Sequence, residues 1–415
     1  MTTTIVVIFL IVYLGMILGG LPFVQLDRTG VALLGAIAMI SFDAVGLQEA
    51  AESIHLPTII LLFSFMVISA QMRLGGFYDW VTRRLGALKV SPPQLLGAMM
   101  IVVAGLSAVF SNDIVCLTVA PVLINACEGR RLNPVPYLLA LACAANIGSA
   151  ATLIGNPQNM LIGQTLHLSF AGYTAQAVPP VALGLMTTWG LIAWQTRGRW
   201  AQHDENLLQH WVQGERDAET PLDLWQTAKG LAVAAVLLLA FLFAPWPREH
   251  VALTAAGVLL MSRRLHSNKM LGLVDWQLLI VFMALFVVNH ALQQTSLPAK
   301  LVTDLTALGL DLRQLGPLFL MTFLLSNVVS NVPAVMLLVP LVDPPMGGLV
   351  LALVSTLAGN LLIVGSIANI IVVDAAARRG IRIDWRRHAR VGIPVTLATL
   401  AICAGYLWLR LRASG

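Results

Sequence analysis

Long apolar runs separated by short polar loops fill the chain from one end to the other. A helix needs about 20 apolar residues to cross the hydrocarbon core of a bilayer, and interrupted stretches are typical of re-entrant segments. By this criterion, five runs on either side of a polar stretch predict membrane-spanning helices. The predicted spans are 3–21, 29–46, 56–73, 137–166, 173–196, 226–244, 250–263, 276–293, 347–376 and 391–410.

Two further apolar stretches, 94–127 and 315–342, have a polar cluster in their middle. A Ser-Asn-Asp cluster begins at Ser111 in the first, and a Ser-Asn pair begins at Ser330 in the second. This pattern predicts helical hairpins that enter the membrane, turn at a polar tip and leave on the same side.

The two halves repeat one pattern at a nearly constant spacing. Ser111 and Ser330 are 330 − 111 = 219 residues apart, and a proline follows ten residues after each. The segment Gly155-Asn-Pro-Gln-Asn matches Gly365-Ser-Ile-Ala-Asn at an offset of 365 − 155 = 210. Because each half has an odd number of spans, the second copy enters the membrane from the opposite face, as in many secondary transporters.

These patterns predict an all-α polytopic membrane protein made of two inverted repeats. Each repeat has five transmembrane helices and one re-entrant hairpin, with broken helices near the membrane midplane, where such transporters bind their cargo. The predicted units are a first repeat 1–196 with hairpin 94–127, a partly helical cytoplasmic linker 197–225, and a second repeat 226–415 with hairpin 315–342.

Composition supports a membrane protein and excludes a nucleic-acid-binding one. Hydrophobic residues make up 58% of the chain and charged residues 11%, with a mean hydropathy of +0.82, whereas soluble domains carry about 25% charged residues. The net charge of +5 comes from basic residues clustered between apolar runs, as expected of cytoplasmic loops. These clusters predict a bacterial inner-membrane protein with both termini on the periplasmic side.

Catalytic and metal-binding patterns are missing from the sequence. The four cysteines form no CxxC pair and no metal-ligand spacing. The chain also has no HExxH motif, no Ser/His/Asp set and no phosphate-binding loop, so it is expected to be neither an enzyme nor a cofactor or metal protein. Any ATP dependence would require a partner, and a cytosolic ATPase subunit is one candidate.

Polar residues concentrate at the predicted helix interruptions. Broken helices are tolerated in a membrane only where protein or water surrounds the freed backbone groups, so the interruptions predict a shared polar cavity that binds substrate and ions. Ordinary helix kinks with interhelical hydrogen bonds are the alternative; four matched interruptions favour the cavity. The candidate binding residues are Ser111, Asn112, Asp113, Thr152, Asn156, Asn159, Ser330, Asn331, Ser366 and Asn369.

Asp113 is the acidic residue of the first tip, and Val332 is its counterpart in the second repeat. A carboxylate at membrane depth costs at least about 2.5–3.5 kcal/mol, so such residues are functional candidates. A low-dielectric site favours the neutral form of a carboxyl, which suits a proton carrier. The alternative role is to fix the hairpin tip through hydrogen bonds, and both roles are compatible.

Three segments resemble the ion-transporter superfamily over essentially the whole chain. They are the Phe-Ser-Asn-Asp tip at 110–113, the segment 146–159 ending in Thr-Leu-Ile-Gly-Asn-Pro-Gln-Asn, and Ser-Asn-Val-Pro at 330–333. The closest similarity is to its arsenite/antimonite permease branch, which is related to anion and Na⁺/H⁺ transporters. The resemblance implies that hairpin tips and unwound helices hold the cargo and coupling ion, and it also implies a homodimer.

By the same resemblance, Asn112 and Asp113 match the Asn-Asp tip of arsenite permeases. Dicarboxylate members carry Ser-Asn-Thr in both halves, whereas the third positions here are Asp113 and Val332. An acidic tip disfavours a dianion and predicts a neutral or cationic cargo such as As(OH)₃. Cys116, one helical turn beyond Asp113, is a candidate arsenite contact, with core packing as the alternative reading.

The functional prediction is therefore proton-coupled efflux of arsenite or antimonite by alternating access in the lipid bilayer. The alternatives are a sodium- or proton-coupled transporter of a small, dicarboxylate-like anion, and a Na⁺/H⁺ antiporter.

Overall fold

The computed structural model describes residues 1–21, 25–201, 221–262, 264–342 and 346–414, and helices dominate these ranges. A short antiparallel ribbon pairs β1 (Gly20–Leu21) with β2 (Leu26–Asp27). The first half contains α1 (Thr2–Leu18), α2 (Arg28–Ser41), α3 (Leu47–Ser53), α4 (Leu56–Leu74), α5 (Phe77–Gly86), α6 (Pro92–Val109), α7 (Asn112–Gly129), α8 (Pro134–Ser149), α9 (Pro157–Thr165) and α10 (Phe170–Gln195). The second half contains α12 (Leu224–Phe243), α13 (Arg248–Leu260), α14 (Ser267–Leu271), α15 (Trp276–Gln293), α16 (Leu297–Ala307), α17 (Leu315–Val329), α18 (Asn331–Leu338), η1 (Val339–Leu341), α19 (Met346–Ala358), η2 (Ile363–Gly365), α20 (Ile367–Arg378) and α21 (Trp385–Ser414).

Within the described residues, six helices are long and apolar enough to cross a bilayer. Large apolar side chains also lie on the outer surface: Phe243 is 81% exposed and Ile101 72% exposed. Such side chains are stable on the outside only against lipid or a partner protein. The predicted all-α polytopic membrane protein is therefore confirmed. The six helices are α4, α6, α10, α12, α15 and the Trp385–Arg412 part of α21.

Helices end at all four predicted interruptions. Two predicted spans are each split in two, because the chain leaves the α-helix at 150–156 and again at 359–366, where the short η2 lies. The breaks between α6 and α7 and between α17 and α18 are shorter, at 110–111 and at Ser330. Asp113 therefore lies in the first turn of α7, and not in the non-helical tip as predicted. α6 has the length of a full span, so length alone does not identify it as part of a hairpin.

The order of helices in the second half follows that of the first. Adding 219 to the bounds of α2 gives 247–260, and α13 spans Arg248–Leu260. Adding 219 to α5 gives 296–305, and α16 spans Leu297–Ala307. This correspondence supports the predicted pair of repeats; their inversion across the membrane stays a prediction.

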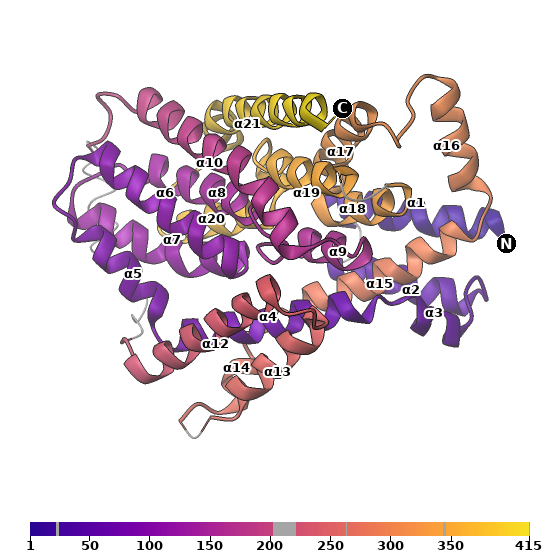
Figure 1. The fold of residues 1–415 in the computed structure, drawn as a ribbon, viewed down its shortest axis with the longest axis horizontal. Helices are drawn as coiled ribbons and strands as arrows, with labels where there is room; N and C mark the ends of the chain where they lie inside the picture. The colour runs from indigo at the N-terminus through magenta and orange to yellow at the C-terminus, as the bar shows by residue number, and fades with distance from the viewer. Residues whose placement is uncertain (22–24, 202–220, 263, 343–345, 415) are drawn as a thin grey trace.

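Helices from the two halves pack together in matched pairs. α4 of the first half packs against α13 of the second, and α15 of the second packs against α2 of the first. α6, α7 and α8 form one cluster with α20, while α17 packs on α19 (Figure 1). In the view of Figure 1, α4 and α12–α14 lie together below, and α10 and α21 lie above.

Sequence features explain where α6 begins and why α8 can pack closely on it. Ser91 caps α6 in a capping box with Gln94, and a proline follows at the first helical position, which suits the unpaired N–H groups of a helix start. A Cβ atom at Gly148 of α8 would lie 2.3 Å from Cα of Ala104 in α6. Only glycine lets the two backbones come this close.

Most of the predicted linker, residues 202–220, lies outside the described residues. Its described end is tied to the first half. The N–H of Asp223 and the hydroxyl of Thr227 both donate to the carbonyl of Gly75, each at 3.0 Å. The start of α12 is thereby held at the end of α4.

Candidate substrate and ion site

Asn146, in the last turn of α8, lies at the centre of a buried polar network. Its Oδ1 accepts hydrogen bonds from Nδ2 of Asn112 at 3.2 Å and from the hydroxyl of Ser366 at 2.9 Å. Its Nδ2 donates to Oδ1 of Asn360 at 3.0 Å and to Oδ1 of Asn369 at 3.1 Å. One side chain thus uses its full hydrogen-bonding capacity to join the first hairpin tip to the second broken helix.

Thr356, near the end of α19, has the corresponding role in the second half: its partners lie at the break of the first half. Its hydroxyl accepts from Nδ2 of Asn156 and from Nε2 of Gln158, each at 3.2 Å, and donates to Oδ1 of Asn159 at 3.4 Å. Nδ2 of Asn156 also donates to the hydroxyl of Ser149 at 2.9 Å. Thr356 therefore joins the second half to the first broken helix.

These two sets of contacts are reciprocal. Thr356 follows Asn146 by 356 − 146 = 210 residues, the offset that also separates Ser366 from Asn156. Asn146 bonds to Ser366, and Thr356 bonds to Asn156; each also contacts the asparagine three residues further along. Reciprocal contacts of this kind are expected from a two-fold relation between the halves.

The same residues start the half-helices that follow the breaks. Oδ1 of Asn156 accepts the N–H of Asn159 at 2.9 Å and caps α9, and the hydroxyl of Ser366 accepts the N–H of Ala368 at 3.2 Å and caps α20. Nδ2 of Asn369 donates to the freed carbonyl of Gly359 at 2.7 Å. The side chains at the breaks thus replace the missing helical hydrogen bonds.

The first hairpin tip is fixed to the first break. The N–H of Asn112 donates to the carbonyl of Gly155 at 3.2 Å, and the hydroxyl of Thr152 donates to the carbonyl of Ala108. A Cβ atom at Gly155 would lie 2.2 Å from the carbonyl oxygen of Ser149, so only glycine fits this turn.

The second tip has an unusual backbone. Ser330 adopts φ 77 and ψ 161, a region that is almost exclusive to glycine and costs other residues about 1–3 kcal/mol. Asn331 beside it is buried, and a Cβ atom at Gly359 would lie 2.9 Å from its Nδ2. The second tip therefore packs onto the second break, as the first tip packs onto the first.

Four buried oxygen atoms at the tips have no hydrogen-bond partner within the described part of the chain. They are Oγ of Ser107 and Ser326 and Oδ1 of Asn112 and Asn331. They form two matched pairs, because 326 − 107 and 331 − 112 both equal 219. An unpartnered buried acceptor costs about 1–3 kcal/mol, so its repetition at equivalent positions makes these atoms candidates for binding a cargo or ion.

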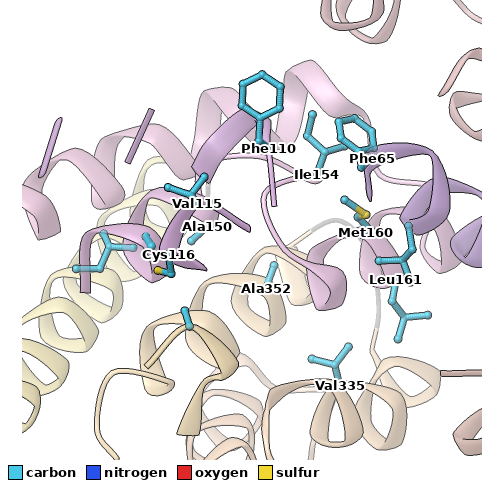
Figure 2. Packing of buried hydrophobic residues seen from close by; sticks show 14 of the residues in the cluster. Phe65, Phe110, Val115, Cys116, Ala150, Ile154, Met160, Leu161, Val335 and Ala352 are labelled. Carbon is cyan, nitrogen blue, oxygen red and sulfur yellow. The ribbon is translucent and has the colours of Figure 1, made fainter. Parts of the chain in front are cut away.

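Asp113 lies apart from this network. Its side chain and that of Ser111 line a cavity of about 100 Å³ beside the first tip. Among the described residues no hydrogen bond reaches the Asp113 carboxyl, so the structure offers no support for a tip-fixing role. Cys116 is fully buried, and Figure 2 shows it among apolar side chains such as Val115 and Ala150, as the packing alternative expects.

The structure thus groups the predicted residues in four places. Asn112, Asn156, Asn159, Ser366 and Asn369 belong to the network, Ser111 and Asp113 line the cavity, Thr152 supports the first tip, and Ser330 and Asn331 form the second tip. Their role in binding stays a prediction.

The sequence analysis missed several members of the network, among them Asn146, Ser149, Gln158, Thr356 and Asn360. The offset of 210 that matched Gly155 with Gly365 also pairs Asn146 with Thr356, so extending the repeat alignment upstream would have found both. Gln158 and Asn360 each align with an alanine of the other repeat, Ala368 and Ala150. No repeat signal marks them.

Comparisons with known proteins agree on transport. A family model described as citrate transporter matches residues 6–358. The inner membrane protein YbiR of Escherichia coli (strain K12) is 33% identical over 360 residues, covering 85% of this chain and 87% of the relative. The silicon efflux transporter LSI3 of rice (Oryza sativa subsp. japonica) is 28% identical over 458 residues, covering 92% of each. A 46 kDa membrane protein of Mycobacterium leprae (strain TN) is 29% identical over 413 residues, covering 93% of this chain and 94% of the relative.

Proposed function

The chain belongs to the citrate transporter family of the ion-transporter superfamily, and from this premise we propose that it exports arsenite or antimonite in exchange for protons. The family places it among secondary transporters. The cargo, the coupling ion and the direction are the proposal.

The observation that supports this cargo is a pair of amide oxygens, one at each tip, that have no hydrogen-bond partner in the described part of the chain. Oδ1 of Asn112 and Oδ1 of Asn331 are buried acceptors, and an uncharged trihydroxy acid such as As(OH)₃ brings O–H donors to satisfy them. A citrate-like trianion brings mostly acceptors, with a single O–H donor, and would need cationic partners. Asn146 and Thr356, which centre the network, bond only to amides and hydroxyls.

The rice relative supports an uncharged cargo. It is a silicon efflux transporter, and silicon, arsenic(III) and antimony(III) all form uncharged hydroxides in neutral water. We assign the proton to Asp113, next to Asn112 in the first turn of α7. The α7 N-terminus stabilises its carboxylate after proton release, while a neutral carboxyl suits the mostly apolar lining around it. Alternation between these two forms would couple proton movement to the hairpin tip.

The test is arsenite flux into everted membrane vesicles under an imposed pH gradient. The wild-type protein should accumulate arsenite in vesicles with an acidic interior, because the protein exchanges protons that flow out down the gradient for arsenite that enters. Asp113→Asn keeps the size of the side chain and its place in the helix but cannot release a proton, so it should abolish gradient-driven accumulation. Wild-type vesicles that move neither arsenite nor antimonite would refute the cargo.

Sodium-coupled anion transport is the second candidate. The hydroxyl oxygens of Ser107 and Ser326 are buried without a hydrogen-bond partner among the described residues. Each serine precedes a tip asparagine by five residues, and hard oxygen atoms are the ligands that alkali cations prefer. Replacing sodium by choline in the flux assay separates the two functions. Transport that stops without sodium, and that Ser107→Ala and Ser326→Ala each weaken, would favour this candidate over proton exchange.

A further inference from the structure

The cavity beside Asp113 contains two further charged side chains. It lies between α4, α7, α20 and the start of α15, and Arg73 and Asp275 line it together with Asp113 and Ser111. The other lining side chains are apolar. Its volume of about 100 Å³ admits several water molecules, since one water needs about 10–15 Å³ of such space.

Asp275 and Asp113 sit at different depths. Asp275 is exposed, whereas Asp113 is only partly accessible. Asp275 also caps α15, because its side chain accepts the N–H of Leu278 at 2.9 Å. This bond holds one carboxylate at the solvent side of the cavity while the other lies further in.

Few other charges face Asp113 from the helices packed on α7. α6 and α8 contain no charged residue. α20 contributes Ile367 and Ile371 to the cavity and carries its charges at its far end. α4 contributes Arg73, and α5 brings Arg83 to the opposite end of α7. Asp79 is buried in the first turn of α5, next to Tyr78, whose ring contacts Phe110, but it does not line the cavity. The charged residues that line the cavity with Asp113 are therefore Asp275 and Arg73.

We propose that this cavity is the route by which Asp113 exchanges its proton with the aqueous face, and that the charge of Asp275 sets the pH of the exchange. The inference rests on the proposed role of Asp113 as proton carrier. In each exchange the Asp113 carboxyl passes its proton to a cavity water and becomes a carboxylate, and the proton leaves past Asp275. The negative charge of Asp275 opposes this release, so its removal should move the midpoint toward acid by about 0.5–1 pH unit.

The test places either sign of charge at the same position. In Asp275→Cys, the exposed thiol is labelled with a negatively charged sulfonatoethyl or a positively charged trimethylammonioethyl methanethiosulfonate. The four native cysteines are at most 2% exposed and are protected from these reagents. The protonated-carboxyl band is then titrated by infrared spectroscopy on protein in nanodiscs, and the part lost in an Asp113→Asn background is assigned to Asp113.

The midpoint with the negative label should lie about 1–2 pH units above that with the positive label, because the labels differ by two charges. Arg73→Gln should shift the midpoint toward alkali. Asp304→Cys is the matched control: its carboxylate is exposed on α16, which contributes no residue to the cavity, and both labels there should leave the midpoint unchanged. Equal midpoints for the two labels at position 275, a reversed order, or a band that does not depend on Asp113 would overturn the inference. The readout needs no cargo, so failure to transport arsenite would refute only the proposed function.

Discussion

At the scale of single residues, the site depends on amide side chains that bond in several directions at once. Asn146 alone connects the first tip to three residues of the second broken helix. A threonine does the corresponding work from the other half, with one hydroxyl in place of an amide. The two residues at the centres of these contacts therefore occupy equivalent positions with different functional groups. The amide of Asn146 has the larger hydrogen-bonding capacity.

Asn146→Ala should remove arsenite transport and lower the thermal unfolding midpoint. It leaves several buried amide and hydroxyl groups without a partner, at a cost of about 1–3 kcal/mol for each group that stays unsatisfied. Thr187→Ala is the control, because that exposed hydroxyl bonds only within its own helix. Thermal unfolding in detergent and vesicle flux measure the two effects; an Asn146→Ala protein with full transport would contradict a central role.

Ser330→Gly should stabilise the protein by about 1 kcal/mol, because glycine adopts the backbone of the second tip without strain. Ser330→Ala removes the same hydroxyl without relieving the strain, so it should not stabilise. Comparing the two unfolding midpoints isolates the backbone effect. If both variants unfold at the same temperature, the tip is not strained.

At the scale of elements, the polar breaks are supported by helices that pack unusually closely. α6 and α8 approach through Gly148, and the turn after α8 depends on Gly155. The half-helices α9 and α20 then begin with the side-chain caps of Asn156 and Ser366. Each break is thus built from a glycine that permits the turn and a polar residue that starts the next helix.

Gly148→Ala should destabilise the protein by about 1–3 kcal/mol, the usual cost of overpacking. The added methyl group would meet the backbone of α6 at Ala104, which cannot move aside as a side chain can. Gly105→Ala in α6 is the matched control, because a Cβ atom there meets nothing within 4 Å. That change should be neutral or stabilising by up to about 1 kcal/mol. Equal unfolding temperatures for the two variants would rule out the tight crossing.

At the scale of the whole molecule, the site exists only where the halves meet. α4 packs on α13 and α15 on α2, so neither half buries its apolar faces alone. The cavity is also formed by both halves, because Asp113 and Arg73 come from the first half and Asp275 from the second. A relative movement of the helix groups would alter the network and the cavity together, as alternating access requires.

The basic loops predict that both termini are periplasmic, since Lys and Arg are retained in the cytoplasm. Alkaline phosphatase, which is active only in the periplasm, should therefore be active when fused at Gly415 or Met1. A fluorescent protein that matures in the cytoplasm should be dark at Gly415 and bright when inserted at Arg382, in the loop between α20 and α21. A bright fusion at Gly415 would reverse the orientation.

Sequence alone determined the class of protein, the positions of the helix breaks and the offsets of 219 and 210. It also identified Asp113 as an acidic residue with no acidic counterpart in the second repeat. These properties follow from local causes: apolar length, glycine and proline at turns, and the cost of a carboxylate in hydrocarbon. Only the tertiary structure decided that Asn146 and Thr356 join the halves, that four tip oxygens have no partner within the described ranges, and that Asp275 shares a cavity with Asp113. Those facts depend on side chains that meet across 150 residues or more of chain, and which of them meet is set by how whole helices pack.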